Sequence, residues 1–267
     1  MIILPAKKDL SLNLFFLLIS DSIKLLLKNP ILFLPKLIIA FLYGIGTFYA
    51  VDLSKSLLSL QSLPYEQMVG FDFNYFFTAL ILLLGLTIFT FFVDLLFSGF
   101  YPIIISLSEK KKFSLKEALK LFKPKIIRIL SVGLILWAIV TVISLIEATI
   151  ISYFNLSSAG FILSFIITFI FVFAFYFVYP KTVFENSKLT KTFSQSFFSS
   201  LNNKKLVFVL SLIPFLVTIV KFIFAYFSDS ILFLFLFWVL VILTGLIYSV
   251  HAVVNQLAYE RLSNSKK

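Results

Sequence analysis

Long apolar segments constrain this sequence more than any other feature. A helix that crosses a bilayer needs roughly 20 mainly apolar residues, and six segments of the chain meet that requirement. We expect the spans near residues 31–51, 73–107, 126–154, 160–183, 206–227 and 231–258. The sequence therefore predicts an all-α, polytopic membrane protein with six transmembrane helices arranged as three hairpins.

The composition supports lipid as the main solvent of the chain. Of the 267 residues, 61% are hydrophobic and 13% are charged, whereas about a quarter of the residues in a soluble domain are charged. A water-soluble fold of this size would have too few polar side chains to cover its surface. One segment, 73–107, is longer than a single perpendicular crossing requires. We expect it to tilt, to bend near Gly99 and Pro102, or to extend beyond the bilayer.

The basic residues predict the orientation. Of the 23 Lys and Arg residues, 20 lie in four segments: the N-terminus, residues 108–128, residues 181–205 and the C-terminus. An even number of spans places all four on one side, and the positive-inside rule makes that side cytoplasmic. We therefore predict a multi-pass protein of the cell membrane with both termini in the cytoplasm.

The net charge of +11 predicts an anionic partner. Because the charges flank apolar segments, they favour the anionic headgroups of membrane lipids at the cytoplasmic face over nucleic acid. A protein partner or a homo-oligomer is left open by the sequence.

An amphipathic segment precedes each predicted pair of spans, with the periodicity of a helix that lies in the membrane interface. Helix-breaking Pro or Asn residues follow each one. The apolar stripes of the second and third segments are Leu115, Ala118, Leu119 and Phe122, and Leu189, Phe193, Phe197 and Leu201.

The pattern predicts three repeats, near 9–107, 113–183 and 187–258, within a single integral membrane domain that covers 1–267. Internal repeats are common in transporters. The alternative is that any polytopic protein joins its hairpins by basic loops.

Three stretches carry a resemblance to a known family: 21–32 (DSIKLLLKNPIL), 113–119 (FSLKEAL) and 179–186 (YPKTVFEN) followed by 193–196 (FSQS). They resemble a family of uncharacterised six-span prokaryotic membrane proteins, which is similar to the membrane domain of some glycerophosphodiester phosphodiesterases. The hydrolase domain of those enzymes has no counterpart here. The resemblance thus implies a fold, a topology and a role near lipids, without the hydrolase activity.

Ionisable groups inside the predicted spans are candidates for function, because each costs about 2.5–3.5 kcal/mol on insertion. They are Asp94, Glu147, Lys221 and His251. Asp94 is interpreted as structural polar packing, with a solute path as the alternative. Glu147 and Lys221 fall at similar depth, and we expect either an ion pair or separate contacts with outer headgroups.

Two further polar residues, Asn255 and Lys36, complete the candidate set. His251 and Asn255 lie one helical turn apart on the last span, and a lone histidine of this kind more often forms hydrogen bonds than binds metal. Lys36, near the inner end of the first span, is expected to snorkel to the headgroups.

The sequence contains no P-loop, HExxH or GxSxG motif and no cysteine. We therefore expect no catalytic residue, no cofactor and no metal site. The favoured function is a lipid-interacting structural or accessory membrane protein. The alternative is a transporter or lipid-handling protein that uses Asp94, Glu147 and Lys221.

Overall fold

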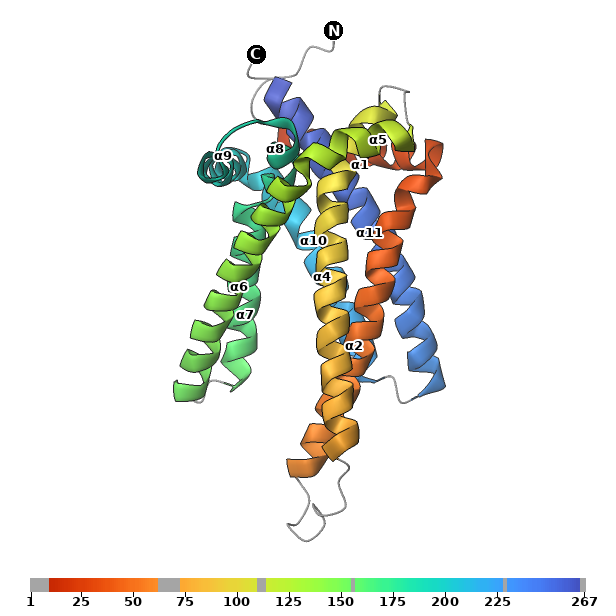
Figure 1. Cartoon of the computed structure of the whole chain (residues 1–267), viewed down its shortest axis with the longest axis vertical. Coiled ribbons are helices and arrows are strands. Elements are labelled where there is room, and N and C mark those ends of the chain that lie inside the picture. Colours follow the sequence, from red (N-terminus) through yellow and green to blue (C-terminus); the bar gives the residue numbers. More distant parts are fainter. Residues whose placement is uncertain (1–9, 62–72, 110–113, 155–156, 228–229, 265–267) are drawn as a thin grey trace. The chain divides into compact units, whose positions relative to one another are not determined.

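The computed structural model describes residues 10–61, 73–109, 114–154, 157–227 and 230–264 (Figure 1). All regular structure in these ranges is helical, which confirms the predicted all-α fold class. Among the described residues, five helices are long and apolar enough to cross a membrane, and one bent pair of helices brings the number to six if it counts as one span. The protein is therefore polytopic.

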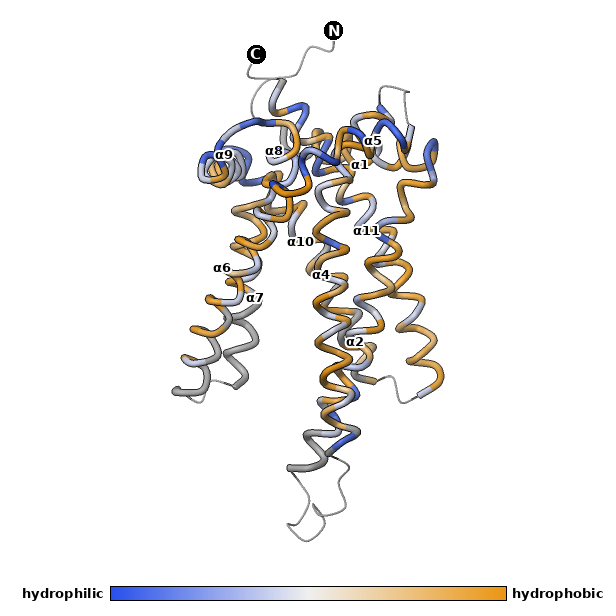
Figure 2. Tube along the Cα trace, in the orientation of Figure 1, coloured by the Kyte–Doolittle hydropathy of each residue, from blue (hydrophilic) through white to orange (hydrophobic). Residues whose placement is uncertain are grey.

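A helix covers each predicted span. Figure 2 shows hydrophobic residues along most of these helices, and many of their aliphatic side chains face outward, where lipid can cover them. The helices are α2 (Leu34–Gln61), α4 (Phe73–Glu109), α6 (Ile126–Phe154), α7 (Ser157–Ala174) with the short α8 (Val178–Phe184), α10 (Lys204–Tyr226) and α11 (Ile231–Asn264).

The chain divides into two compact units. The first unit contains residues 1–32, 95–215 and 250–267, and the second contains 33–94 and 216–249. Helices α4, α10 and α11 contribute residues to both units. The division does not follow the boundaries of the three predicted repeats, which stay a prediction.

Three amphipathic helices occur where the sequence predicts them: α1 (Leu10–Lys28), α5 (Leu115–Phe122) and α9 (Leu189–Asn202). Each ends at a break before the next long helix. A short 3-10 helix follows α1 at Pro30–Phe33, a second follows α5 at Lys123–Lys125, and Asn203 separates α9 from α10. At the third break the chain turns by 100°. Within the described ranges, the order of amphipathic helix, break and long apolar helix therefore occurs three times.

α9 turns a face of small hydroxyl side chains toward the protein. Thr192, Ser196 and Ser200 are fully buried, whereas Phe197 and Leu201 of the predicted apolar stripe are about 40% exposed. Small hydroxyl side chains allow α9 to pack closely on α7 and α8 within the first unit. Phe197, Phe198 and Leu201 face outward, where lipid can cover them, whereas Phe193 packs edge to face on Phe175.

Close contacts between α4 and α6 organise the first unit. A Cβ atom on Gly99 would lie 2.5 Å from the side chain of Ile129, and one on Gly133 would lie 2.0 Å from that of Leu95. Each glycine thus receives an aliphatic side chain of the opposite helix. α4 continues as a helix through both Gly99 and Pro102 to Glu109, so neither residue interrupts it.

In the second unit, glycines allow the same close packing between α2 and α11. Gly44 lies against Val241, and Gly245 lies against Leu37. Phe237 is fully buried in the small apolar core of this unit. Both units therefore pack their long helices through small residues, as membrane helices commonly do.

Candidate functional site

A break in the helical path after α7 positions the polar residues of the first unit. α7 ends at Ala174. α8 then covers only Val178–Phe184, which is about two turns. Lys181 and Glu185 lie four residues apart, at the last turn of α8 and immediately after it. At this spacing the two side chains project from the same face.

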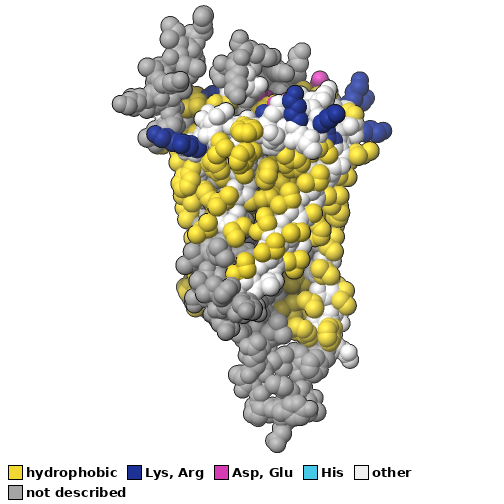
Figure 3. Space-filling model, turned by 90° about the vertical axis from the view of Figure 1, so that its left-hand side faces the viewer, with side chains coloured by type: hydrophobic (Ala, Val, Ile, Leu, Met, Phe, Trp, Pro, Cys, Tyr) yellow, Lys and Arg dark blue, Asp and Glu magenta, His cyan; other side chains and the backbone are white. Residues whose placement is uncertain are grey.

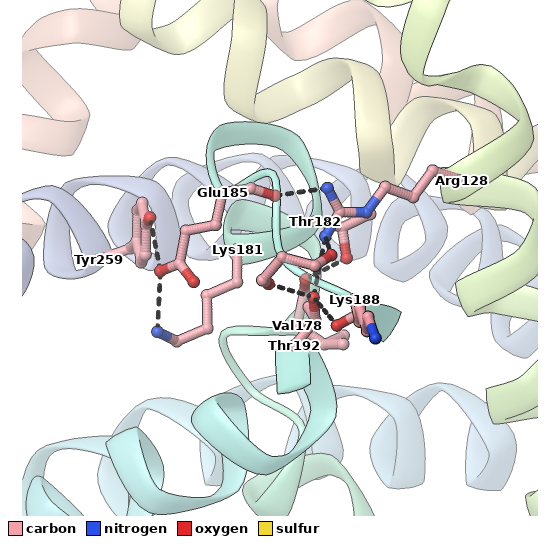
Figure 4. A network of polar contacts seen from close by, with 9 residues as sticks. Arg128, Val178, Lys181, Thr182, Glu185, Lys188, Thr192 and Tyr259 are labelled. Carbon is pink, nitrogen blue, oxygen red and sulfur yellow. Dashed lines mark hydrogen bonds and ion pairs between the residues drawn. The ribbon is translucent and has the colours of Figure 1, made fainter. Parts of the chain in front are cut away.

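Arg128 holds the segment that follows α8. Its guanidinium donates to the backbone carbonyls of Glu185 and Ser187 and, over 2.9 Å, to Oγ1 of Thr192. Figure 4 shows this guanidinium close to the Glu185 carbonyl, on the side away from Tyr259. Lys125 donates to the carbonyl of Val183 in the same stretch. These bonds satisfy carbonyls that no helix satisfies, and they fix the backbone from which the Glu185 side chain projects.

Lys181, Glu185 and Tyr259 form a compact polar cluster (Figure 4). Nζ of Lys181 lies 3.1 Å from Oε1 of Glu185, and the Tyr259 hydroxyl donates to the same oxygen over 3.2 Å. The Lys181 ammonium also lies 5.6 Å from the centre of the Tyr259 ring. The Lys181 side chain is only 10% exposed, and it is stabilised by a carboxylate and an aromatic ring.

A cavity of about 470 Å³ opens beside this cluster, between α8, α9 and the end of α11. We call it the α9 pocket. Its size lies in the range of small-molecule sites, and its wall combines an ion pair, amides, hydroxyls and aromatic rings. The polar lining residues are Lys181, Glu185, Gln195, Ser199, Asn202, Asn203, Tyr259 and Ser263. Such a wall can bind a polar group through several hydrogen bonds.

The candidates His251 and Asn255 lie in the first unit and share one neighbour, Tyr176. Nδ2 of Asn255 donates to the Tyr176 carbonyl over 2.9 Å, and the rings of His251 and Tyr176 pack edge to face at 5.4 Å. Asn255 thus binds a carbonyl of the residues between α7 and α8, where helical hydrogen bonding is interrupted. These two residues support the break from which α8 begins.

The candidate Asp94 lies in the second unit, where the structure pairs it with Lys36. Nζ of Lys36 is 3.1 Å from Oδ1 of Asp94, and the Tyr43 hydroxyl lies 3.4 Å from Oδ2. The Lys36 side chain is 13% exposed. The expectation that Lys36 snorkels to the headgroups is therefore wrong, because its long stem instead brings the ammonium to a carboxylate inside the spans.

A second cavity of about 280 Å³ lies between α2 and α4 in the same unit. Tyr43 and Thr90 line it, and Thr90 precedes Asp94 by one helical turn. The other lining residues are mostly aliphatic. The ion pair of Asp94 thus lies next to a groove with a few hydroxyl groups.

The side chains of the remaining two candidates, Glu147 on α6 and Lys221 on α10, lie outside the described part of the structure. Their expected pairing stays a prediction.

Sequence reasoning missed the residues of the α9 pocket. Lys181 and Glu185 are visible in the sequence as a Lys and a Glu at i and i+4, inside the 179–186 stretch that carries the family resemblance. In the sequence, however, Lys181 only adds to the basic residues that predict the orientation in the membrane. Tyr259 and Gln195 come from other helices, and no local pattern could connect them to Lys181.

Comparison with protein-family models, with curated proteins and with solved structures found no match. The family resemblance therefore stays an expectation, and the function has to be argued from the residues themselves. What the fold defines is a class, that of polytopic α-helical membrane proteins.

Proposed function

We propose that this protein is a lipid-interacting structural or accessory membrane protein that binds headgroups at its Lys-rich end. In this proposal the Lys-rich end faces the cytoplasm, and both termini lie there. No catalytic step is assigned to the chain. The band of Lys and Arg side chains next to a hydrophobic surface supports this arrangement (Figure 3).

The observation that carries the proposal is the surface of α5. Only Ala118 and Phe122 of this helix are buried, while Leu115 and Leu119 are each about half exposed. Exposed lysines at 116, 120 and 123 lie beside them. In the membrane interface the leucines can enter the acyl region while the ammonium groups contact phosphates.

The charge on α5 favours anionic lipid. Each basic residue near a membrane surface contributes about 1 kcal/mol of attraction to anionic headgroups. Glu117 is the only acidic residue in α5, so the attraction is not cancelled.

The test is a lipid titration of the purified full chain in a neutral detergent, followed by native mass spectrometry. We expect phosphatidylglycerol to bind more tightly than phosphatidylcholine. Lys120→Gln should weaken phosphatidylglycerol binding about fivefold, which corresponds to about 1 kcal/mol. Lys55→Gln is the matched control, since Lys55 lies on the opposite side in the proposed topology. Equal losses for the two variants would count against the proposal.

A second candidate, transport or lipid handling, is favoured by one observation. The Lys36–Asp94 pair lies beside the groove between α2 and α4, and intramembrane ion pairs often mark solute or proton paths. Glu147 and Lys221, which the sequence places inside predicted spans, are the other candidates for this function. The test is a flux or lipid-scrambling assay in liposomes with wild type and Asp94→Asn. Flux that is the same with and without protein would reject transport.

A further inference from the structure

The α9 pocket contains hydrogen-bonding capacity that the protein itself does not use. Within the described residues, Lys181 makes one hydrogen bond, to Oε1 of Glu185, and Oε2 of Glu185 accepts none. Oε1 of Gln195 is buried and, in the same part of the chain, accepts no hydrogen bond. A buried acceptor of this kind is destabilising while it stays unsatisfied. The pocket therefore offers free donors on one side chain and free acceptors on two others.

The positive and negative charges of the ionised side chains in the pocket cancel. Lys181 and Glu185 are the only charged residues among the described ones that line it. A ligand with net charge would leave one excess charge in a partly desolvated site. A ligand with one positive and one negative group would match both side chains at once.

The acceptors favour a cation that carries N–H groups. A primary ammonium can donate to Oε2 of Glu185 and to Oε1 of Gln195, whereas a quaternary ammonium has no hydrogen to donate. Quaternary ammonium groups are instead recognised by open aromatic cages. The Tyr259 ring already faces the Lys181 ammonium at 5.6 Å, so that ring is not open to such a group.

The surroundings favour an amphiphile. Phe198 lines the pocket and is 58% exposed, and its neighbour Phe197 is also exposed on α9. Ser199 and Asn202, on the same helix, line the polar part of the pocket. A lipid could place its headgroup in the pocket and its acyl chains along these phenylalanines.

We propose that the α9 pocket binds a zwitterionic phosphate–ammonium headgroup, as in phosphatidylethanolamine. The phosphate contacts the free N–H groups of Lys181, and the primary ammonium contacts Glu185 and Gln195. This inference rests on the proposed role in lipid binding and names a second headgroup class, at a place distinct from the lysines of α5.

The experiment titrates the purified full chain in neutral detergent with three short-chain lipids and measures binding by native mass spectrometry. The lipids carry ethanolamine, choline or glycerol headgroups on the same acyl chains. We expect the ethanolamine lipid to bind at least tenfold more tightly than the choline lipid. Equal affinities would overturn the proposal.

Two leucine variants on α9 locate the site. Ser199→Leu places a larger apolar side chain in the pocket, and Ser194→Leu makes the same change at an exposed position outside it. We expect Ser199→Leu to weaken ethanolamine-lipid binding at least tenfold and Ser194→Leu to leave it unchanged. Similar binding by the two variants would overturn the proposal.

A double variant covers the case in which Ser199→Leu fails to fold. Lys181→Gln with Glu185→Gln keeps the pocket neutral and similar in shape, and it should also lose the preference for ethanolamine. If the double variant kept that preference, the proposal would be wrong. Lys120→Gln should change only the binding of the glycerol lipid, so a failure of the α5 proposal is distinguishable from a failure here.

Free phosphoethanolamine distinguishes the two sources of this chemistry. Competition by phosphoethanolamine at concentrations similar to those of the lipid would assign the site to a soluble zwitterion. Competition only at much higher concentrations would assign it to the lipid, with the acyl chains contributing to affinity.

Discussion

At the scale of residues, Lys181 shows how a charged side chain can be retained in a largely apolar chain. Its ammonium is neutralised by Glu185 and covered by the Tyr259 ring. A buried ion pair adds little stability compared with well-packed apolar residues, but the loss of one partner leaves an uncompensated charge. The pair therefore makes this position sensitive to single substitutions and tolerant of paired ones.

Lys181→Met should lower the free energy of unfolding by about 2–4 kcal/mol, because Glu185 would keep its charge without the ammonium beside it. The double variant Lys181→Met with Glu185→Leu should lower it by less than half as much. Thermal unfolding of both variants in the same detergent measures the difference. A double variant that is less stable than the single one would contradict this account.

For the Lys36–Asp94 pair in the second unit, we expect a similar difference between single and double variants. Asp94→Asn removes the charge that lies 3.1 Å from the Lys36 ammonium, and we expect a loss of about 1–3 kcal/mol. Lys36→Met combined with Asp94→Asn should recover at least half of that loss. The measurement is again the midpoint of thermal unfolding, and no recovery in the double variant would show that the two side chains act independently.

At the scale of elements, the α4–α6 contact depends on two glycines, one on each helix, and each lies against a side chain of the other helix. Gly133→Ala would place a Cβ atom 2.0 Å from the Leu95 side chain, and overpacking of this kind costs about 1–3 kcal/mol. A Cβ atom on Gly85 of α4, by contrast, would have no neighbouring side chain within 4 Å among the described residues. Gly85→Ala should therefore be neutral or stabilising by up to about 1 kcal/mol, since alanine favours helix.

Thermal unfolding of the two glycine variants side by side tests this contact. If Gly133→Ala were as stable as Gly85→Ala, α4 and α6 would not pack as closely as the structure shows.

The hydroxyl face of α9 gives the second prediction at this scale. Ser196 is fully buried against the protein, whereas Ser194 of the same helix is exposed. Ser196→Leu should lower the free energy of unfolding by about 1–3 kcal/mol through overpacking, and Ser194→Leu should have almost no effect. The reverse order of stabilities would mean that α9 presents its phenylalanines to the protein and its hydroxyl groups to lipid.

At the scale of the whole molecule, the distribution of lysines predicts a single topology. The chain contains no cysteine, so single cysteines can report on sidedness without interference. Lys120→Cys should react with a membrane-impermeant maleimide only after cells are permeabilised, and Lys55→Cys should react in intact cells. Equal labelling of both positions in intact cells would reject the predicted orientation.

The sequence by itself determined the fold class, the approximate spans and the three amphipathic helices. These features depend on local quantities, namely the length of apolar segments and the period of polar side chains, which can be read along one stretch of chain. The breaks near Asn29, Pro124 and Asn203 were predictable for the same reason, since Pro and Asn are favoured where helices end.

Only the tertiary structure decided which polar groups meet. Asp94 pairs with Lys36, which is 58 residues away in the sequence. Glu185 accepts a hydrogen bond from Tyr259, which is 74 residues away. It also decided that α9 turns its hydroxyl groups inward. The amphipathic pattern of a membrane helix indicates that one face is apolar, but either lipid or protein can cover such a face. The packing of neighbouring helices determines which of the two does so.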